Sequence, residues 1–164
     1  MKTKTNSKTD TIQQHSDLLL QVNNDLAITN SLDEALEALV GITTSIIKCE
    51  RGTIFLNDAK SEELYSRVAQ GNFMREIRFM NSKGVAGWSY TNKKGAIVHD
   101  AYKDDRFNKN VDIRTGFRTK SILCMPLSTV SGKVIGVSQL LNKLDGQFSE
   151  NDLELIEAMT KQAA

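Results

Sequence analysis

The sequence contains little cysteine, and this scarcity excludes a disulfide-stapled fold. Cys49 and Cys124 are the two cysteines among 164 residues, and a small secreted domain built on disulfides would need more. We therefore expect a reducing, cytoplasmic environment. Each cysteine lies within an apolar stretch, which favours a buried small hydrophobic residue over a nucleophile.

The sequence also lacks an excess of charge and a long apolar run. Its 21 Lys and Arg residues against 20 Asp and Glu leave a net charge of +1, too little to attract nucleic acid or an anionic membrane over a broad surface. No apolar run approaches the roughly 20 residues of a membrane span, and the N-terminus has no signal-peptide pattern. We expect this chain to contact neither nucleic acid nor membrane.

Catalytic signatures are missing as well. The two histidines, His15 and His99, have no partner in a metal-ligand spacing. Neither a G-x-S-x-G motif nor a phosphate-binding P-loop occurs. The sequence therefore predicts a chain that is not itself an enzyme and that needs no metal or other cofactor.

The length suits one domain with an N-terminal extension, since domains cluster near roughly 100–150 residues. Residues 1–10 are polar, which predicts a disordered tail. Residues 11–30 contain an apolar stripe at helical spacing, formed by Ile12, Leu19, Val22 and Leu26. Because this stripe is more apolar than an exposed helix requires, we predict a homodimer through the terminal helices. The alternative is a monomer whose first helix packs on its own sheet.

Residues 31–164 predict an α+β domain with an antiparallel sheet of about six strands. Ser31 and Glu34 form a capping box before an amphipathic helix that continues to Ile47. Short β-prone runs follow at 53–56, 64–69, 76–80 and 96–98, a short helix begins at Gly84, and residues 99–118 are predicted to be irregular. The strongest strands, 121–127 and 133–141, form a hairpin, and Ser149 caps a final helix. Hairpin-linked strands indicate an antiparallel sheet.

Two segments combine residues that could form a binding site. The sequence Gly84-Val-Ala-Gly87 opens a helix, and its backbone amides suit an anion such as phosphate; the alternative is that the glycines serve close packing. Asp112, Thr115 and Thr119 supply donors and acceptors at the mouth of a strand. The alternative there is a loop whose polar side chains satisfy one another.

Together these segments resemble the GAF domains of cyclic-nucleotide phosphodiesterases and cyanobacterial-type adenylyl cyclases. The resemblance covers roughly residue 31 to the C-terminus and rests on residues 115–126, 134–137 and 139–143. The subgroup's signature Asn-Lys-(x)n-Phe-x-x-x-Asp-Glu is matched by Asn142, Lys143, Phe148 and Asp152, with Leu153 in place of the final Glu.

The resemblance implies a sheet with terminal helices on one face and a ligand pocket on the other. Motif matching assigns nucleotide contacts to Arg51, Thr53, Val85, Ala86, Asn108, Asp112, Thr115, Thr119 and Gln139. In this assignment the amides of Val85 and Ala86 meet the cyclic phosphate, and Gln139 helps to read the purine edge. An aromatic–acidic pair that contacts the purine in some such domains is replaced here by Ala69-Gln70.

The resemblance also implies that Lys143 and Asp152 pair and hold the pocket in shape. From the residues alone, Asp152 could equally be a favourable charge at a helix start, and both roles can hold together.

We therefore interpret the chain as a regulatory sensor that binds a cyclic nucleotide, cAMP rather than cGMP, and controls an output domain of a larger protein. The alternative is a ligand-free GAF module that supplies dimer contacts and transmits signals. The sequence leaves open whether the output domain is a cyclase, a phosphodiesterase, a kinase or a transcription factor.

Overall fold

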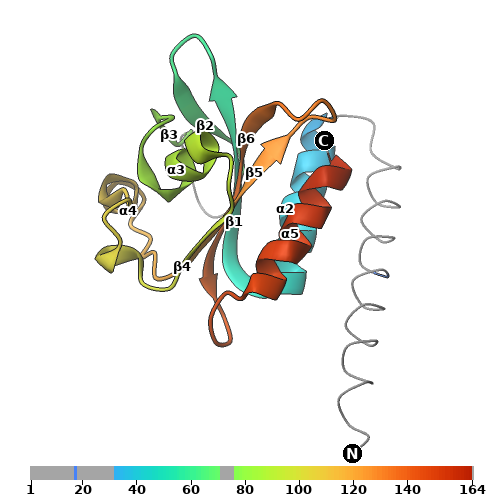
Figure 1. The fold of residues 1–164 in the computed structure, drawn as a ribbon. Helices are drawn as coiled ribbons and strands as arrows, with labels where there is room; N and C mark the ends of the chain where they lie inside the picture. The colour runs from blue at the N-terminus through green and yellow to red at the C-terminus, as the bar shows by residue number, and fades with distance from the viewer. Residues whose placement is uncertain (1–16, 18–31, 71–75, 164) are drawn as a thin grey trace, which may run out of the picture.

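The computed structural model describes residues 17, 32–70 and 76–163 (Figure 1). The predicted tail over 1–10 and, apart from Asp17, the apolar stripe over 11–30 lie outside the described residues. Within them, six strands form one antiparallel sheet in the order β3-β2-β1-β6-β5-β4. This arrangement confirms the predicted α+β class.

The two longest strands form the centre of the sheet. The strands are β1 (Cys49–Asp58), β2 (Glu63–Ala69), β3 (Arg78–Met80), β4 (Ala96–Val98), β5 (Ile122–Ser128) and β6 (Val134–Lys143). β1 and β6 pair from Cys49↔Lys143 to Leu56↔Gly136. Gly136 lies so close to β1 that a Cβ there would clash with the Phe55 carbonyl oxygen. β1 is longer than predicted because its polar ends continue the ladder.

The helices divide between the two faces of the sheet. They are α2 (Leu32–Ile47), α3 (Gly84–Asn92), α4 (Lys109–Thr115) and α5 (Glu150–Ala163), with a 3₁₀ helix η1 (Ala101–Lys103). Figure 1 shows α2 and α5 side by side on one face, and α3 and α4 on the opposite face. We call these the helix face and the pocket face. The predicted arrangement of helices is confirmed in this respect.

Each face has its own hydrophobic core. The helix-face core consists mainly of aliphatic residues from α2, α5 and the sheet, among them Leu36, Leu39, Ile54, Leu140 and Ile156. The pocket-face core includes Phe55, Val85, Ala86, Cys124 and Val137. The two cores share the same sheet because alternate residues of a strand point to opposite faces.

The prediction of an irregular segment over 99–118 is wrong in part, because this segment contains η1 and α4. Helix α4 begins after Asn108, whose side chain accepts a hydrogen bond from the Asn110 amide, as N-cap residues do. It ends at Gly116, which has a left-handed conformation with φ of 71° and therefore suits glycine. Both end signals were present in the sequence, but the polar, β-branched interior concealed the helix.

Candidate ligand-binding site

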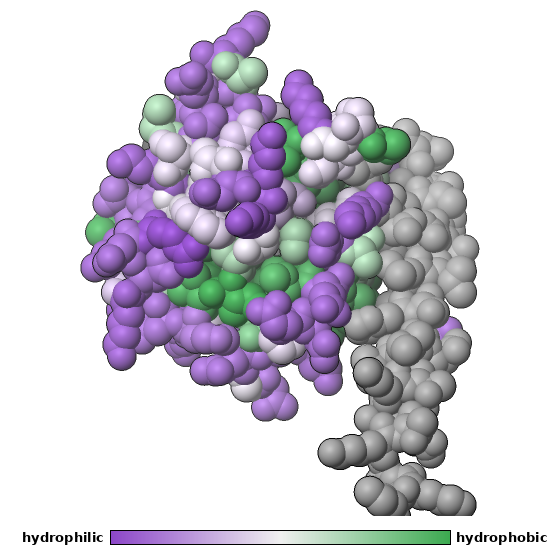
Figure 2. Space-filling model, in the orientation of Figure 1, coloured by the Kyte–Doolittle hydropathy of each residue, from purple (hydrophilic) through white to green (hydrophobic). Residues whose placement is uncertain are grey.

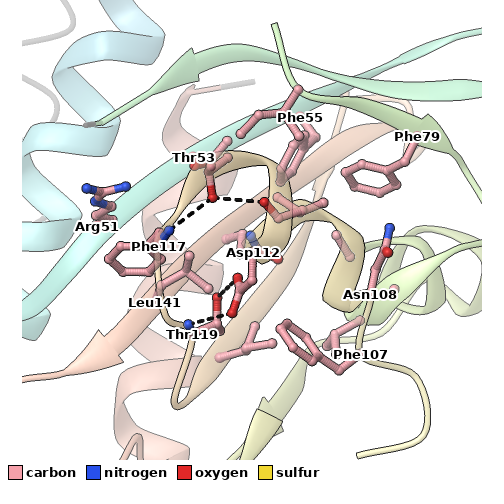
Figure 3. Close-up of a pocket in the computed structure, with 18 residues that line it drawn as sticks. Arg51, Thr53, Phe55, Phe79, Phe107, Asn108, Asp112, Phe117, Thr119 and Leu141 are labelled. Atoms are coloured by element: carbon pink, nitrogen blue, oxygen red, sulfur yellow. Dashed lines mark hydrogen bonds between the residues drawn. The ribbon is translucent and has the colours of Figure 1, made fainter. Parts of the chain in front are cut away.

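A pocket opens on the pocket face between the sheet, α3 and the α4 region (Figure 3). It is lined by 18 residues: Arg51, Thr53, Phe55, Ile77, Phe79, Gly84, Val85, Ala86, Phe107, Asn108, Val111, Asp112, Thr115, Phe117, Thr119, Ile122, Gln139 and Leu141. All nine residues that motif matching assigned to nucleotide contacts are among them. The structure therefore brings these nine together, and their contact with a ligand stays a prediction.

The start of α3 supplies backbone amides to the pocket. Gly84 opens the helix with a φ of 73°, and Val85 and Ala86 are each 2% exposed. Lys83 occupies the N-cap position but makes no side-chain hydrogen bond to the helix. Since the first amides of a helix have no partner within it, these donors and the positive end of the helix dipole suit an anionic group.

A buried carboxylate lies at the side of the pocket formed by α4. Asp112, 7% exposed, accepts hydrogen bonds from the Thr119 amide at 2.8 Å and the Thr119 hydroxyl at 2.6 Å (Figure 3). Its Oδ2 atom also accepts from the Tyr102 hydroxyl at 2.8 Å. The two predicted site residues Asp112 and Thr119 thus bind each other, as the alternative of an internally satisfied loop predicted.

The pocket is also lined by four phenylalanines that were not predicted from the sequence: Phe55, Phe79, Phe107 and Phe117. The rings of Phe55 and Phe79 meet edge to face with centroids 5.1 Å apart. The Arg51 guanidinium lies 4.0 Å from the centre of the Phe117 ring, within the range of a cation–π contact. The signal for Phe55 was available, because it lies two residues after Thr53 and therefore points to the same face of β1.

The replaced aromatic–acidic pair lies away from this pocket. Neither Ala69 nor Gln70 belongs to its lining. Instead the Gln70 side chain accepts from the Gly52 amide at 3.0 Å and donates to the Thr44 hydroxyl at 3.3 Å. Gln70 therefore ties β1 to α2, and this position supplies no stacking surface for a purine.

The pocket is small in this conformation. Its volume is about 60 Å³, on a measure by which one water molecule needs roughly 10–15 Å³. The space therefore holds a few water molecules. A nucleotide is far larger, and its binding requires one wall of the pocket to move.

The signature residues Lys143 and Asp152 form the predicted ion pair. Lys143 Nζ lies 3.0 Å from Asp152 Oδ2, and the two side chains are 15% and 16% exposed. Lys143 also donates to the Ile47 carbonyl at 2.6 Å, at the end of α2. Asp152 accepts from the Ser149 amide, and the Ser149 hydroxyl accepts from the Asp152 amide, so Asp152 is also part of the cap of α5. The structure thus shows both the ion pair and the helix-start position of Asp152, and the role of the pair in holding the pocket in shape stays a prediction.

Asn142, the first residue of the signature, binds the segment that leads into β5. It is 4% exposed and left-handed, with a φ of 60°. Its carbonyl oxygen accepts from the Lys120 and Ser121 amides at 2.6 and 3.2 Å. Its amide group donates to Glu50 at 2.7 Å and to the Arg118 carbonyl at 3.0 Å. Phe148, 2% exposed, belongs to the helix-face core.

The cysteines are buried and free, as predicted. Burial raises the pKa of the Cys49 thiol to about 11, and burial raises the pKa of the Cys124 thiol further above its ordinary value. Both remain protonated at neutral pH, which argues against a nucleophile. In the part of the chain that the structure describes, no group of three or more His, Cys, Asp or Glu residues could hold a metal ion.

A second groove lies between the turn over 93–95, β5 and α5. Figure 2 shows apolar surface gathered in the middle of this side of the molecule, with hydrophilic side chains around it. Met125, Pro126 and Leu153 contribute to the groove, and Lys93, Lys94 and Lys161 are also among its lining residues. None of the predicted site residues lies there. Across residues 32–70 and 76–163, no helix is both long and apolar enough to cross a membrane.

Known proteins resemble this chain in sequence and in fold. The family model of the GAF domain matches residues 31–164, and the chain belongs to this family. A relative in Caenorhabditis elegans, named "Probable 3',5'-cyclic phosphodiesterase pde-5", is 35% identical over 139 residues, which are 77% of this chain and 19% of the relative. The dual 3',5'-cyclic-AMP and -GMP phosphodiesterase 11 of Drosophila melanogaster is 43% identical over 88 residues, 53% of this chain and 6% of that protein. The resemblance to GAF domains of the phosphodiesterase type is thereby confirmed.

A solved structure supports the fold alone. The GAF domain of an Acinetobacter phosphoenolpyruvate-protein phosphotransferase superposes with a TM-score of 0.78 at 20% identity, covering 92% of this chain and 90% of that one. The chain spans about a fifth or less of the length of the two phosphodiesterase relatives. It therefore corresponds to their GAF part and not to the whole proteins.

Proposed function

We propose that the pocket binds a cyclic nucleotide and that its occupancy regulates an output domain elsewhere in the parent protein. The observation that carries this proposal is the convergence of all nine motif-matched residues on one pocket in a chain of the GAF family. In this proposal the cyclic phosphate lies at the start of α3, where the amides of Val85 and Ala86 have no side-chain cap to compete with it.

The chemistry of the remaining wall favours cAMP over cGMP. Cys124 Sγ donates to Gln139 Oε1 at 3.5 Å, which leaves the Gln139 amino group as a donor for a ring nitrogen of adenine. Guanine offers acceptors at N7 and O6 to the same donor, but its N1 and N2 donors require an acceptor in addition. Asp112 is the carboxylate among the lining residues, and three hydrogen bonds already engage it. Relatives named as cGMP-specific phosphodiesterases favour the other nucleotide, so both belong in the test.

A second candidate is a ligand-free GAF module that transmits signals between neighbours. The small pocket volume and the internal pairing of Asp112 with Thr119 favour it. In that case pocket residues would serve stability alone.

Substitutions that remove one polar group without changing side-chain size test the proposal. Thr53→Val deletes a hydroxyl within the pocket lining, and Gln139→Leu deletes the amide. Each should weaken cAMP binding by about 0.5–1.5 kcal/mol, and Gln139→Leu should also reduce the preference for cAMP over cGMP. Thr91→Val is the matched control, because Thr91 lies near the end of α3 outside the lining. Equal cAMP affinities in the unmodified chain and in all three variants would contradict the site assignment.

The same proposal includes the location, the assembly and the output domain of the parent protein. We place the chain in the cytoplasm, in keeping with two free buried thiols, and as a homodimer through its terminal helices. The output domain is a further part of the parent chain, and the phosphodiesterase names of the relatives make a phosphodiesterase the first choice.

A further inference from the structure

Helix α4 is the wall of the pocket with the least apolar anchoring. Asp112 is its one buried residue, while the large side chain of Ile113 is 78% exposed. On the same face α3 buries Val85 and Ala86, each 2% exposed. Elements with few buried apolar contacts open most readily, so α4 is the wall best suited to move when a ligand is admitted.

One carboxylate fastens α4 to the segments on both sides of it. Before the helix, the Tyr102 hydroxyl of η1 donates to Asp112 at 2.8 Å. After the helix, the amide and hydroxyl of Thr119 donate to Asp112 at 2.8 and 2.6 Å, and Thr119 is 3% exposed. Hydrogen bonds to a charged group are roughly twice as strong as neutral ones. Asp112 therefore joins three segments in one closed arrangement.

Tyr102 contributes to this arrangement from outside the pocket, because it does not belong to the lining. The ring packs against the pocket-face core, with the Arg118 guanidinium 4.0 Å from its centre and the Phe107 ring 5.1 Å away, so the ring is held in place. The hydrogen bond to Asp112 raises the pKa of the Tyr102 hydroxyl above its ordinary value, because that bond favours the protonated form.

We propose that Asp112 and Tyr102 form a latch that holds α4 closed over the pocket, with Tyr102 as the positioning residue. The proposal rests on the proposed function in that the ligand admitted is the cyclic nucleotide. With about 60 Å³ beneath it, the closed helix excludes a nucleotide. A nucleotide then binds only the state in which the latch is open.

Tyr102→Phe tests the latch because it removes one hydroxyl and leaves every pocket-lining residue intact. Tyr90→Phe is the matched control, since Tyr90 lies in the same pocket-face core and has no hydrogen bond from its hydroxyl among those of the described residues. In the protein without ligand, hydrogen exchange of the amides over 109–121 should be roughly tenfold faster in Tyr102→Phe. Exchange in α2, α5 and β6 should be unchanged, and the control should match the unmodified chain.

Stopped-flow binding of cAMP supplies the second arm. Tyr102→Phe should raise the association rate constant roughly tenfold and lower Kd in proportion, with the dissociation rate constant little changed, because the nucleotide binds only the open state. If Asp112 only contacts ligand, Tyr102→Phe would leave both rates unchanged. Equal exchange over 109–121 in Tyr102→Phe and Tyr90→Phe, or equal acceleration throughout the domain, would overturn the latch. Faster exchange confined to 109–121 without any nucleotide binding would support the latch and reject the proposed function.

Discussion

The two faces of the sheet are built for different purposes, and neighbouring residues of β6 show the difference. Leu140 points into the helix face and is 0% exposed, while Leu141 lines the pocket on the other face. The helix face is closed by α2 and α5 over aliphatic side chains. The pocket face has shorter helices, four phenylalanines and a cavity.

The helix face and the pocket face differ in how easily they can rearrange. A filled aliphatic core has the density of an organic crystal and resists change, whereas a face with a cavity and a polar latch can rearrange at lower cost. The helix face therefore provides the rigid support, and the pocket face provides the movable part. The signature residues join the two, because Asn142 binds the segment over 118–121 and Lys143 binds α2 and α5.

The largest expected effect comes from truncating the two neighbouring leucines. Leu140→Ala should destabilise the fold by about 2–5 kcal/mol, because it leaves a new cavity in a filled core. Leu141→Ala should cost about 1–2 kcal/mol, because its side chain already borders a void and the loss is mainly that of buried methylene groups. Denaturant unfolding of both variants measures the difference. Equal losses would show that the two faces are packed alike.

A smaller effect is expected from the Lys143–Asp152 pair. Lys143→Ala or Asp152→Ala should destabilise the domain by about 1–3 kcal/mol, since each leaves a partly buried charge without its partner. The matched control is the exposed pair Lys161–Glu157, whose side chains are 74% and 51% exposed and whose loss should cost about 0–1 kcal/mol. In a double-mutant cycle the first pair should show coupling. Additive losses would mean that Asp152 acts only as a helix-start charge.

The smallest effect on the domain itself concerns assembly. We expect residues 1–164 to form a dimer in light scattering and the chain without residues 1–30 to form a weaker one, while unfolding of the domain changes little. The reason is the apolar stripe over 11–30, which exceeds what an exposed helix requires. A monomer at high concentration of the full chain would assign that stripe to contacts within one molecule.

The sequence predicted the frame of the fold better than its movable part. Periodic apolar residues located α2 and α5, and the hairpin between β5 and β6 followed from its turn. Helix α4 was missed because its apolar residues, Val111 and Ile113, do not form a buried stripe. Its end signals at Asn108 and Gly116 carried the information instead.

The residues of the candidate site were likewise predicted only in part. Motif matching located nine lining residues but assigned none of the four phenylalanines to the site, although Phe117 lies within the matched run 115–126. Tyr102 could not be assigned from spacing, because its role depends on how η1 folds back toward Asp112. Contacts between loops depend on tertiary placement, which local patterns do not encode.

The central claim, that this pocket binds a cyclic nucleotide, is tested most directly by calorimetric titration of the purified chain. Mass spectrometry of ligand released on denaturation should first establish whether the pocket is already occupied. We predict one site per chain for cAMP, weaker binding of cGMP, and weaker binding still of linear 5'-AMP, which lacks the cyclic phosphate. No heat from either cyclic nucleotide at millimolar concentration, with no nucleotide released from the protein, would contradict the claim and leave the ligand-free module.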